Sequence, residues 1–352
     1  MKTLLASTFI ISSIIIAGTI IYSSLKKKKM EILKKKVYFN MDGNNDDFVA
    51  FLLLLNFRNV ELVGIAITPA DCDPNSALEF VTKILHKRGL KVPIVISDVE
   101  PVNDFPDAFK QTSIKANYLP TLLNIEDTEE NQLDTDASEH MYTTLKKIYE
   151  ETQEKVTFLI TGPPSSLVKA MKSHPEIKDY IEEVFWMGGA IDVSGNVGDS
   201  PYSEYNAYWD PTSTKEFIES GLSIKILSLD ATNSVPVNKN LLSRLSKISG
   251  KYEAANLANE IFAIAYFIDP EGLDTYFAWD CMASMALGYD DLITFKEAKV
   301  DVITEKSETD NQEGRIMKNE NSKNIVKYGQ PLDSKAMENF YEAFINTLKY
   351  NL

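Results

Sequence analysis

The chain has 352 residues, 44% hydrophobic and 25% charged, which is typical of globular proteins and excludes wholesale disorder, collagen and a multi-span membrane protein. The formal net charge is −15, but residues 1–36 hold eight lysines and one glutamate and carry +7, which leaves −22 on the remainder. A body this acidic repels polyphosphate backbones, so we expect no nucleic-acid partner, whereas metal cations and neutral small molecules remain open. Two cysteines, Cys72 and Cys281, are too few for a disulfide framework.

The N-terminal segment is uncharged over the 23 residues between Lys2 and Lys26, which is long enough to cross a bilayer as a helix. The more basic flank follows this segment, and the positive-inside rule then places the rest of the chain on the cytoplasmic side of a membrane. We therefore expect residues 1–29 to form a single-pass membrane anchor with a lysine-rich flank. A cleaved signal peptide and a translation start at Met30 are the alternatives.

From residue 36 onward, short β-branched runs alternate with helical stretches. The pattern predicts strands at 37–41, 60–67, 92–96, 156–160, 184–187 and 224–229, with helices at 46–56 and 75–87. Such alternation is typical of βαβ units and predicts an α/β fold: an open, mostly parallel, Rossmann-like sheet with helices on both faces. One domain covers residues 36–350, with a loop at 126–136 and a polar surface excursion at 305–324.

The first predicted strand runs directly into a turn that contains three carboxylates, Asp42, Asp46 and Asp47, and three amides. In open parallel sheets, ligands bind beyond the carboxyl ends of the strands, which is where this turn lies. Asp46 and Asp47 could simply complement the dipole of the following helix, but capping does not account for Asp42. Three carboxylates within six residues favour a bound cation, and their oxygen atoms suit Ca²⁺ or Mg²⁺. Both interpretations stay open on this segment alone.

This turn resembles the Asp-rich motif of the nucleoside N-ribohydrolases, whose usual form is DxDxxxDD. Further blocks match that family in order along the chain, at residues 68–72, 161–163, 187–197, 204–211, 228–236 and 276–280. Within the inosine-uridine preferring nucleoside hydrolases, the chain is most similar to the purine-specific inosine-adenosine-guanosine type, which shares the DGNxDDF and AWD motifs. The resemblance implies a hydrolase that acts on N-glycosyl bonds and serves purine salvage.

The resemblance also implies one Ca²⁺ ion held by Asp42, Asp47, Asp280 and the backbone carbonyl of Thr161. An ion with six to eight oxygen ligands can bind a ribose diol and the attacking water together. Because Ca²⁺ acidifies water weakly, a carboxylate must take the proton, and Asp42 is the expected general base. Asp280 has an alternative role as a surface aspartate at a helix start.

For the substrate, the resemblance implies contacts around the ribose and around the purine. The residues are Asp46, Asn196, Glu204 and Asn206 at the ribose hydroxyls, Met187 beneath the sugar, Asn44 beside it, Asp71 at the purine edge, and Trp279 and Phe109 as two stacking rings. Tyr276 is expected near the base, with packing as an equal alternative. The three histidines, His86, His140 and His174, fall outside the matching blocks and are expected to be solvated.

Two departures from the family pattern matter for function. Asn40 replaces the first Asp of the motif, which removes a negative charge close to the expected metal. Trp279 stands where the pyrimidine-tolerant branch has a histidine, and an indole favours purine stacking. The alternatives are a broader ribohydrolase that also cleaves pyrimidine nucleosides, and a membrane-tethered, non-catalytic nucleoside binder. By analogy with relatives we also expect a homodimer.

Overall fold

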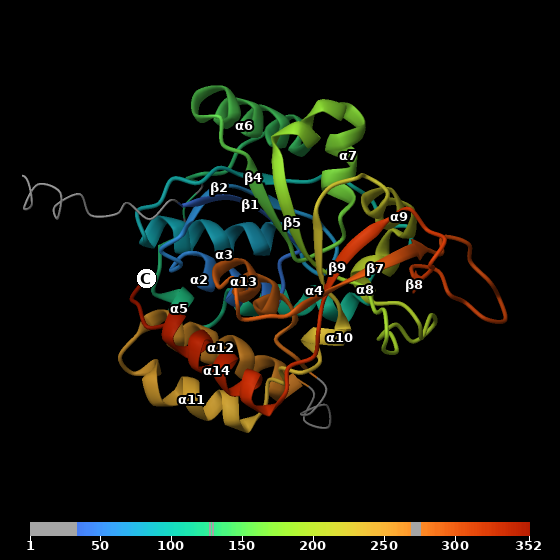
Figure 1. The fold of residues 1–352 in the computed structure, drawn as a ribbon. Helices are drawn as coiled ribbons and strands as arrows, with labels where there is room; N and C mark the ends of the chain where they lie inside the picture. Colours follow the sequence, from blue (N-terminus) through green and yellow to red (C-terminus); the bar gives the residue numbers. More distant parts are fainter. Residues whose placement is uncertain (1–33, 127, 129, 269–275) are drawn as a thin grey trace, which may run out of the picture. The chain divides into compact units, whose positions relative to one another are not determined.

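The computed structural model describes residues 34–126, 128, 130–268 and 276–352 (Figure 1). The predicted anchor at residues 1–29 lies outside these ranges. Within them, no helix is long and apolar enough to span a membrane. The longest, α6 (Ala137–Thr152) and α12 (Glu253–Ile268), have 16 residues each, about 24 Å against the ~30 Å hydrocarbon core of a bilayer. The predicted membrane localisation is therefore corrected.

The described residues form one nine-stranded sheet in the order β3-β2-β1-β4-β5-β6-β9-β7-β8. The strands are β1 (Lys35–Met41), β2 (Val60–Ile67), β3 (Ile94–Ile96), β4 (Val156–Ile160), β5 (Ile181–Met187), β6 (Ile224–Leu227), β7 (Phe295–Val302), β8 (Ile316–Lys318) and β9 (Ile325–Gly329). All pairs from β3 to β9 are parallel, and the pairs made by β7 are antiparallel. The predicted open, mostly parallel α/β sheet is confirmed.

Helices cover both faces of this sheet, as the alternation of side chains along β1 illustrates. Val37, Phe39 and Met41 pack on one face and Tyr38 on the other, all fully buried. The first face is covered by α2 (Asn45–Leu54), α3 (Pro74–Lys87), α12, α13 (Trp279–Gly288) and α14 (Ser334–Thr347), with α11 (Lys239–Ser249) against α12. The second face carries α6, α7 (Ser165–Ser173) and α9 (Pro211–Ile218) (Figure 1).

Shorter helices occupy other connections between the strands. They are α4 (Asp107–Ala116), α5 (Pro120–Leu123), α8 (Tyr205–Trp209), α10 (Leu229–Thr232) and a 3₁₀ helix at Pro175–Tyr180. The sixth predicted strand ends at Leu227, because Leu229 already begins α10. The predicted surface excursion at 305–324 is corrected in part: it contains β8, which pairs with β7 because Ile316 is buried against the sheet.

Candidate active site

The turn between β1 and α2 is shaped by a glycine and an asparagine cap. Gly43 has a φ of +73°, which L side chains rarely adopt, and a Cβ there would lie 2.6 Å from the Cβ of Ala77. Asn44 caps α2: its side-chain oxygen accepts from the N–H of Asn45 at 2.8 Å, and its own N–H donates to the Asp47 carboxylate at 3.0 Å. The cap therefore orients Asp47 at the edge of the sheet.

Three buried carboxylates meet at this edge. Asp46, Asp47 and Asp280 each offer an oxygen atom, and these atoms all lie within 4.8 Å of one another. Asp280 comes from the first turn of α13, and its N–H donates to Asp46 at 3.3 Å. Thr161 follows β4 and donates its hydroxyl to Asp47 at 2.6 Å. Because strand order reverses between β1 and β4, this is the position where open α/β sheets bind ligands.

Asp42 lies beside this cluster and is 3% exposed. Its side chain packs against Gly162, where a Cβ would lie 2.8 Å from the carboxyl carbon of Asp42. The three carboxylates whose oxygen atoms lie within 4.8 Å of one another thus include Asp46, and they do not include the predicted ligand Asp42. Burial and the neighbouring Asp47 carboxylate raise the pKa of Asp42 well above its usual range.

Electrostatics favour a cation in this cluster. Burial, and then repulsion by neighbouring carboxylates, raise the pKa of Asp46 to about 7 and that of Asp280 well above its usual range. The donors are carboxylate, hydroxyl and carbonyl oxygens, which hard divalent cations such as Ca²⁺ and Mg²⁺ prefer. The residues present therefore fit a metal of this class.

A cavity of about 490 Å³ opens onto the cluster, and its described lining contains no lysine, arginine or histidine. It brings together twelve of the thirteen site residues predicted from the sequence: Asp42, Asn44, Asp46, Asp71, Phe109, Thr161, Met187, Asn196, Glu204, Asn206, Trp279 and Asp280. Asp47 lies outside the lining, hydrogen-bonded to Thr161. One carboxylate oxygen of Asp71 is buried without a hydrogen-bond partner among the described residues.

Two residues of the block around α8 are already held by the protein. The Glu204 carboxylate accepts from the N–H groups of Gly189 at 2.8 Å and Asn206 at 2.9 Å, and burial raises the pKa of Glu204 to about 7. The side-chain amide of Asn206 donates to the carbonyl oxygens of Thr161 at 3.2 Å and Met187 at 3.1 Å. Glu204 thus links α8 to the loop after β5, and Asn206 links α8 to the ends of both β4 and β5.

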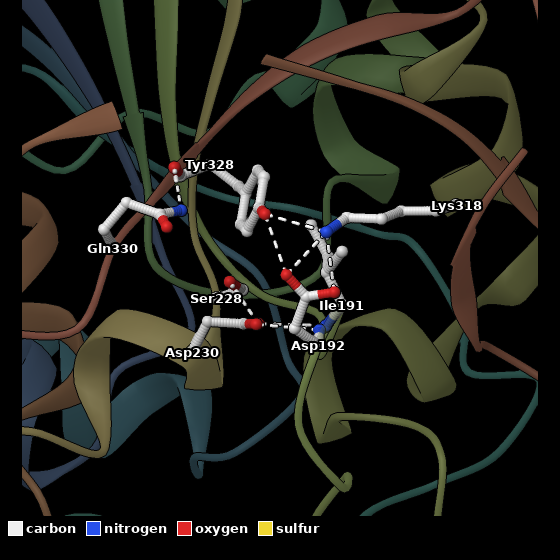
Figure 2. Close-up of polar contacts among 7 residues, drawn as sticks. All are labelled: Ile191, Asp192, Ser228, Asp230, Lys318, Tyr328 and Gln330. Atoms are coloured by element: carbon white, nitrogen blue, oxygen red, sulfur yellow. Dashed lines mark hydrogen bonds and ion pairs between the residues drawn. The ribbon is translucent and has the colours of Figure 1, made fainter. Parts of the chain in front are cut away.

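The loop after β5 is held by a carboxylate to which the sequence assigns no role (Figure 2). Asp230 accepts hydrogen bonds from the N–H of Ile191 at 2.9 Å, the N–H of Asp192 at 2.7 Å and the hydroxyl of Ser228 at 2.8 Å. The Asp192 carboxylate in turn accepts from Lys318, as Figure 2 shows. This network positions the loop that leads to Asn196 at the cavity.

Several aromatic rings line the cavity. Phe109 contacts Tyr205 and Phe105, with ring centroids 5.3 Å and 6.2 Å from its own, and Trp279 contacts Tyr276 at 4.9 Å. Sequence reasoning missed Phe105 and Tyr205. Both were detectable, because Phe105 lies in the same loop as Phe109 and Tyr205 lies between two predicted site residues.

Tyr276 and the histidines refine the sequence interpretation. The Tyr276 hydroxyl donates to Asp46 at 3.0 Å, so this residue has a polar contact in the site as well as packing contacts. The expectation that all three histidines are solvated is wrong for His140, which is 7% exposed and hydrogen-bonded to the Tyr38 hydroxyl at 2.7 Å. Tyr38 belongs to β1 and His140 to α6, so this hydrogen bond joins the helix to the sheet.

Asn40, the departure from the family motif, lies buried at the end of β1. Its amide donates to the Thr68 hydroxyl at 2.8 Å and to the carbonyl of Ala66 at 3.3 Å. Its side-chain oxygen has no hydrogen-bond partner among the described residues. The Thr68 hydroxyl continues to Ser166 at 2.8 Å, which extends a polar chain beneath the site.

The family model described as inosine-uridine preferring nucleoside hydrolase matches residues 37–339. The chain therefore belongs to this family, and it is a hydrolase acting on N-glycosyl bonds. The fold, the reversal of strand order and the acidic cluster at that point agree with this assignment.

Individual relatives span most of the chain. The structure of an inosine-uridine preferring nucleoside hydrolase from Bacillus anthracis is 28% identical, with a TM-score of 0.80, and the match covers 90% of this chain and 99% of that one. A purine-preferring ribonucleoside hydrolase from Gardnerella vaginalis is 20% identical with a TM-score of 0.71 and the same coverage, which shows the shared fold. The pyrimidine-specific ribonucleoside hydrolase RihB of Escherichia coli is 22% identical over 263 residues, 69% of this chain and 81% of that protein.

Proposed function

We propose that this protein hydrolyses the N-glycosidic bond of purine ribonucleosides, in a Ca²⁺-dependent reaction that releases the free base and ribose. One observation carries the proposal: a single cavity is lined both by the buried carboxylates of Asp42, Asp46 and Asp280 and by aromatic rings that include Phe109 and Trp279. A sugar and an aromatic base joined by a glycosidic bond match this combination of polar and aromatic groups. A purine offers more area for stacking than a pyrimidine, and stacking on an aromatic side chain contributes about 1–3 kcal/mol per base.

The oxygen atoms of Asp42, Asp47, Asp280 and the Thr161 carbonyl would hold Ca²⁺, which when bound supplies a fixed charge that orients the ribose diol and a water molecule. Thr161 and the Asn44 N–H already orient Asp47 through hydrogen bonds of 2.6 Å and 3.0 Å. The Asp46 oxygens accept from the Tyr276 hydroxyl and the Asp280 N–H, and a carboxylate oxygen has a second lone pair that would accept from a ribose hydroxyl.

In the chemical step, the Asp42 carboxylate accepts a proton from water while the water oxygen bonds to the anomeric carbon. The bond from that carbon to the base nitrogen breaks, and its electron pair leaves with the base, which takes up a proton from solvent water. Positive charge develops on the sugar in the oxocarbenium-like transition state. The carboxylates of Asp46 and Glu204 stabilise that charge, while Trp279 and Phe109 hold the base between them.

A broader or pyrimidine-directed activity is the second candidate. It is favoured by the RihB relatives of Escherichia coli, which are named as pyrimidine-specific. Trp279 argues for purines. Its indole N–H donates to the side-chain oxygen of Asn233 at 3.2 Å, so the residue presents no proton donor of histidine type to the leaving base.

The test is to incubate the full chain, with Ca²⁺ bound, with inosine and with uridine and to measure free ribose. We expect release from inosine well above release from uridine. Comparable uridine turnover would support the broader hydrolase, and binding of inosine without release would support the non-catalytic binder. Asp42→Asn is the matched variant, and it should lose turnover while retaining affinity for inosine.

Light scattering on the same sample tests the expected homodimer.

A further inference from the structure

Asn44 lines the cavity, yet the protein itself uses the whole hydrogen-bonding capacity of its side chain. An asparagine amide has two N–H donors and two acceptor lone pairs. The Asn44 nitrogen donates to the backbone carbonyls of Asp71 at 2.9 Å and Phe109 at 3.0 Å. The Asn44 oxygen accepts from the N–H of Asn45 at 2.8 Å and from the hydroxyl of Thr112. Asn44 therefore has no free donor or acceptor for the predicted substrate contact.

Two of the four partners of this amide belong to α4, the helix that carries Phe109. The Thr112 hydroxyl also lies 2.6 Å from the carbonyl oxygen of Phe109, so its single proton is shared between that carbonyl and Asn44. Phe109 and Thr112 are three residues apart, which places both on the cavity side of the helix. The Asn44 amide and the Thr112 hydroxyl thus both bond to the backbone carbonyl of Phe109, whose ring is expected to stack on the base.

The rest of α4 is weakly attached. No side chain caps its first turn, and of its ten residues only Ser113 and Ala116 are buried. Since helices in proteins are stabilised chiefly by burying an apolar face, polar contacts take a larger share in holding this one. Ser113 supplies one other such contact, because its hydroxyl accepts from the N–H of Asp73 at 3.0 Å.

We propose that Thr112 and Asn44 form a latch that holds α4, and with it the Phe109 ring, at the base end of the cavity. This inference rests on the proposed function and deepens it by making Thr112 a positioning residue for base recognition. The latch joins the Phe109 backbone to Asn44 in the turn after β1, and among the described residues the Thr112 hydroxyl bonds to these two and to none of the expected metal ligands. Loss of the Thr112 hydroxyl should therefore weaken binding of the base and spare binding of the sugar.

Thr112→Val removes the hydroxyl at nearly constant volume, and Thr112→Ser retains it. We expect Thr112→Val to raise the KM for inosine about fivefold to tenfold, which corresponds to one neutral hydrogen bond. Its kcat should stay within about twofold of the parent, since the reacting groups are unchanged. The inhibition constant of ribose, which reports on the sugar end alone, should not move. Thr112→Ser should behave as the parent in all three measurements.

Hydrogen exchange of the amides at 107–116 supplies a readout that needs no substrate, and it should be faster in Thr112→Val than in Thr112→Ser. Unchanged exchange together with an unchanged KM would overturn the latch. A parallel change in kcat and ribose inhibition would overturn the positioning role, because it would indicate general damage to the site. If the parent neither binds nor cleaves inosine, the proposed function fails, whereas the exchange comparison still decides whether the latch exists.

Discussion

The hydroxyl of Thr161 donates a hydrogen bond of 2.6 Å to Asp47, although the two residues are 114 positions apart in the sequence. The contact links the end of β4 to the first turn of α2 across the reversal of strand order. The other Asp47 oxygen accepts from the N–H of Asn44 at 3.0 Å. Both oxygens of a predicted metal ligand are thus oriented by the protein.

Thr161→Val should weaken Ca²⁺ binding about tenfold, in line with the effect of removing groups that orient a metal ligand. The substitution keeps the backbone carbonyl and removes the hydroxyl that orients Asp47. Titration calorimetry on protein first stripped of metal measures the change, and Thr161→Ser is the matched control that retains the donor. Parent-like affinity in the valine variant would show that Asp47 does not depend on this bond.

Asp230→Asn should lower kcat/KM for inosine about tenfold while leaving Ca²⁺ affinity unchanged. The new NH₂ group faces backbone N–H donors of the loop after β5, so at least one hydrogen bond to Ile191 or Asp192 is replaced by repulsion. Steady-state kinetics check the result. Lys318→Met is the control: it breaks an ion pair whose side chains are 41% and 50% exposed, and we expect less than about a twofold effect. Equal effects of the two variants would contradict a positioning role for Asp230.

Trp279→Ala should raise the KM for inosine by about tenfold to a hundredfold, the equivalent of one lost stacking contact. The indole is partly exposed at the cavity and contacts Tyr276 at a centroid distance of 4.9 Å. Trp279→Phe should recover part of the loss, because a phenyl ring still stacks with less area. Kinetics with inosine and uridine separate the cases, and an equal loss for both nucleosides would remove the argument for purine preference.

The stability of the metal-free protein should depend on pH through Glu204. Burial raises the pKa of Glu204 from 4.5 to about 7, so the folded state keeps this proton while the unfolded chain releases it. The folded state then binds more protons between those two values, and the free energy of unfolding must fall as pH rises through that window. The free energy of unfolding falls by roughly 3 kcal/mol in total, and the fall is complete above about pH 7.

Urea unfolding of the parent and of Glu204→Gln in the presence of a chelator, from pH 4.5 to pH 8, tests this. The glutamine does not titrate, so its free energy of unfolding should decline less steeply than that of the parent. Glu204 also caps α8, and a loss of stability that Glu204→Gln causes there equally at every pH does not affect the comparison of slopes. Parallel curves would show that Glu204 does not titrate in this window.

Much of the fold could be read from periodicity. The strands from β1 to β6 were expected within three residues of their ends, the largest difference being at the start of β5, because buried parallel strands are continuous apolar runs followed by polar turns. The antiparallel β8 was missed, since it lies in a polar stretch and only Ile316 of its three residues is buried. The burial of His140 was missed for a similar reason: its partner Tyr38 is 102 positions away.

For the candidate site, local sequence determined the turn after β1, where Gly43 and Asn44 can be recognised by their backbone roles, and the order of the chemical groups along the chain. Tertiary structure alone decided which groups meet. Asp280 reaches Asp46 across 234 positions because α13 packs on α2, and the Asn44 amide is occupied because α4 lies over it. Such contacts depend on how helices pack on the sheet, and packing is set by the whole core rather than by any one segment.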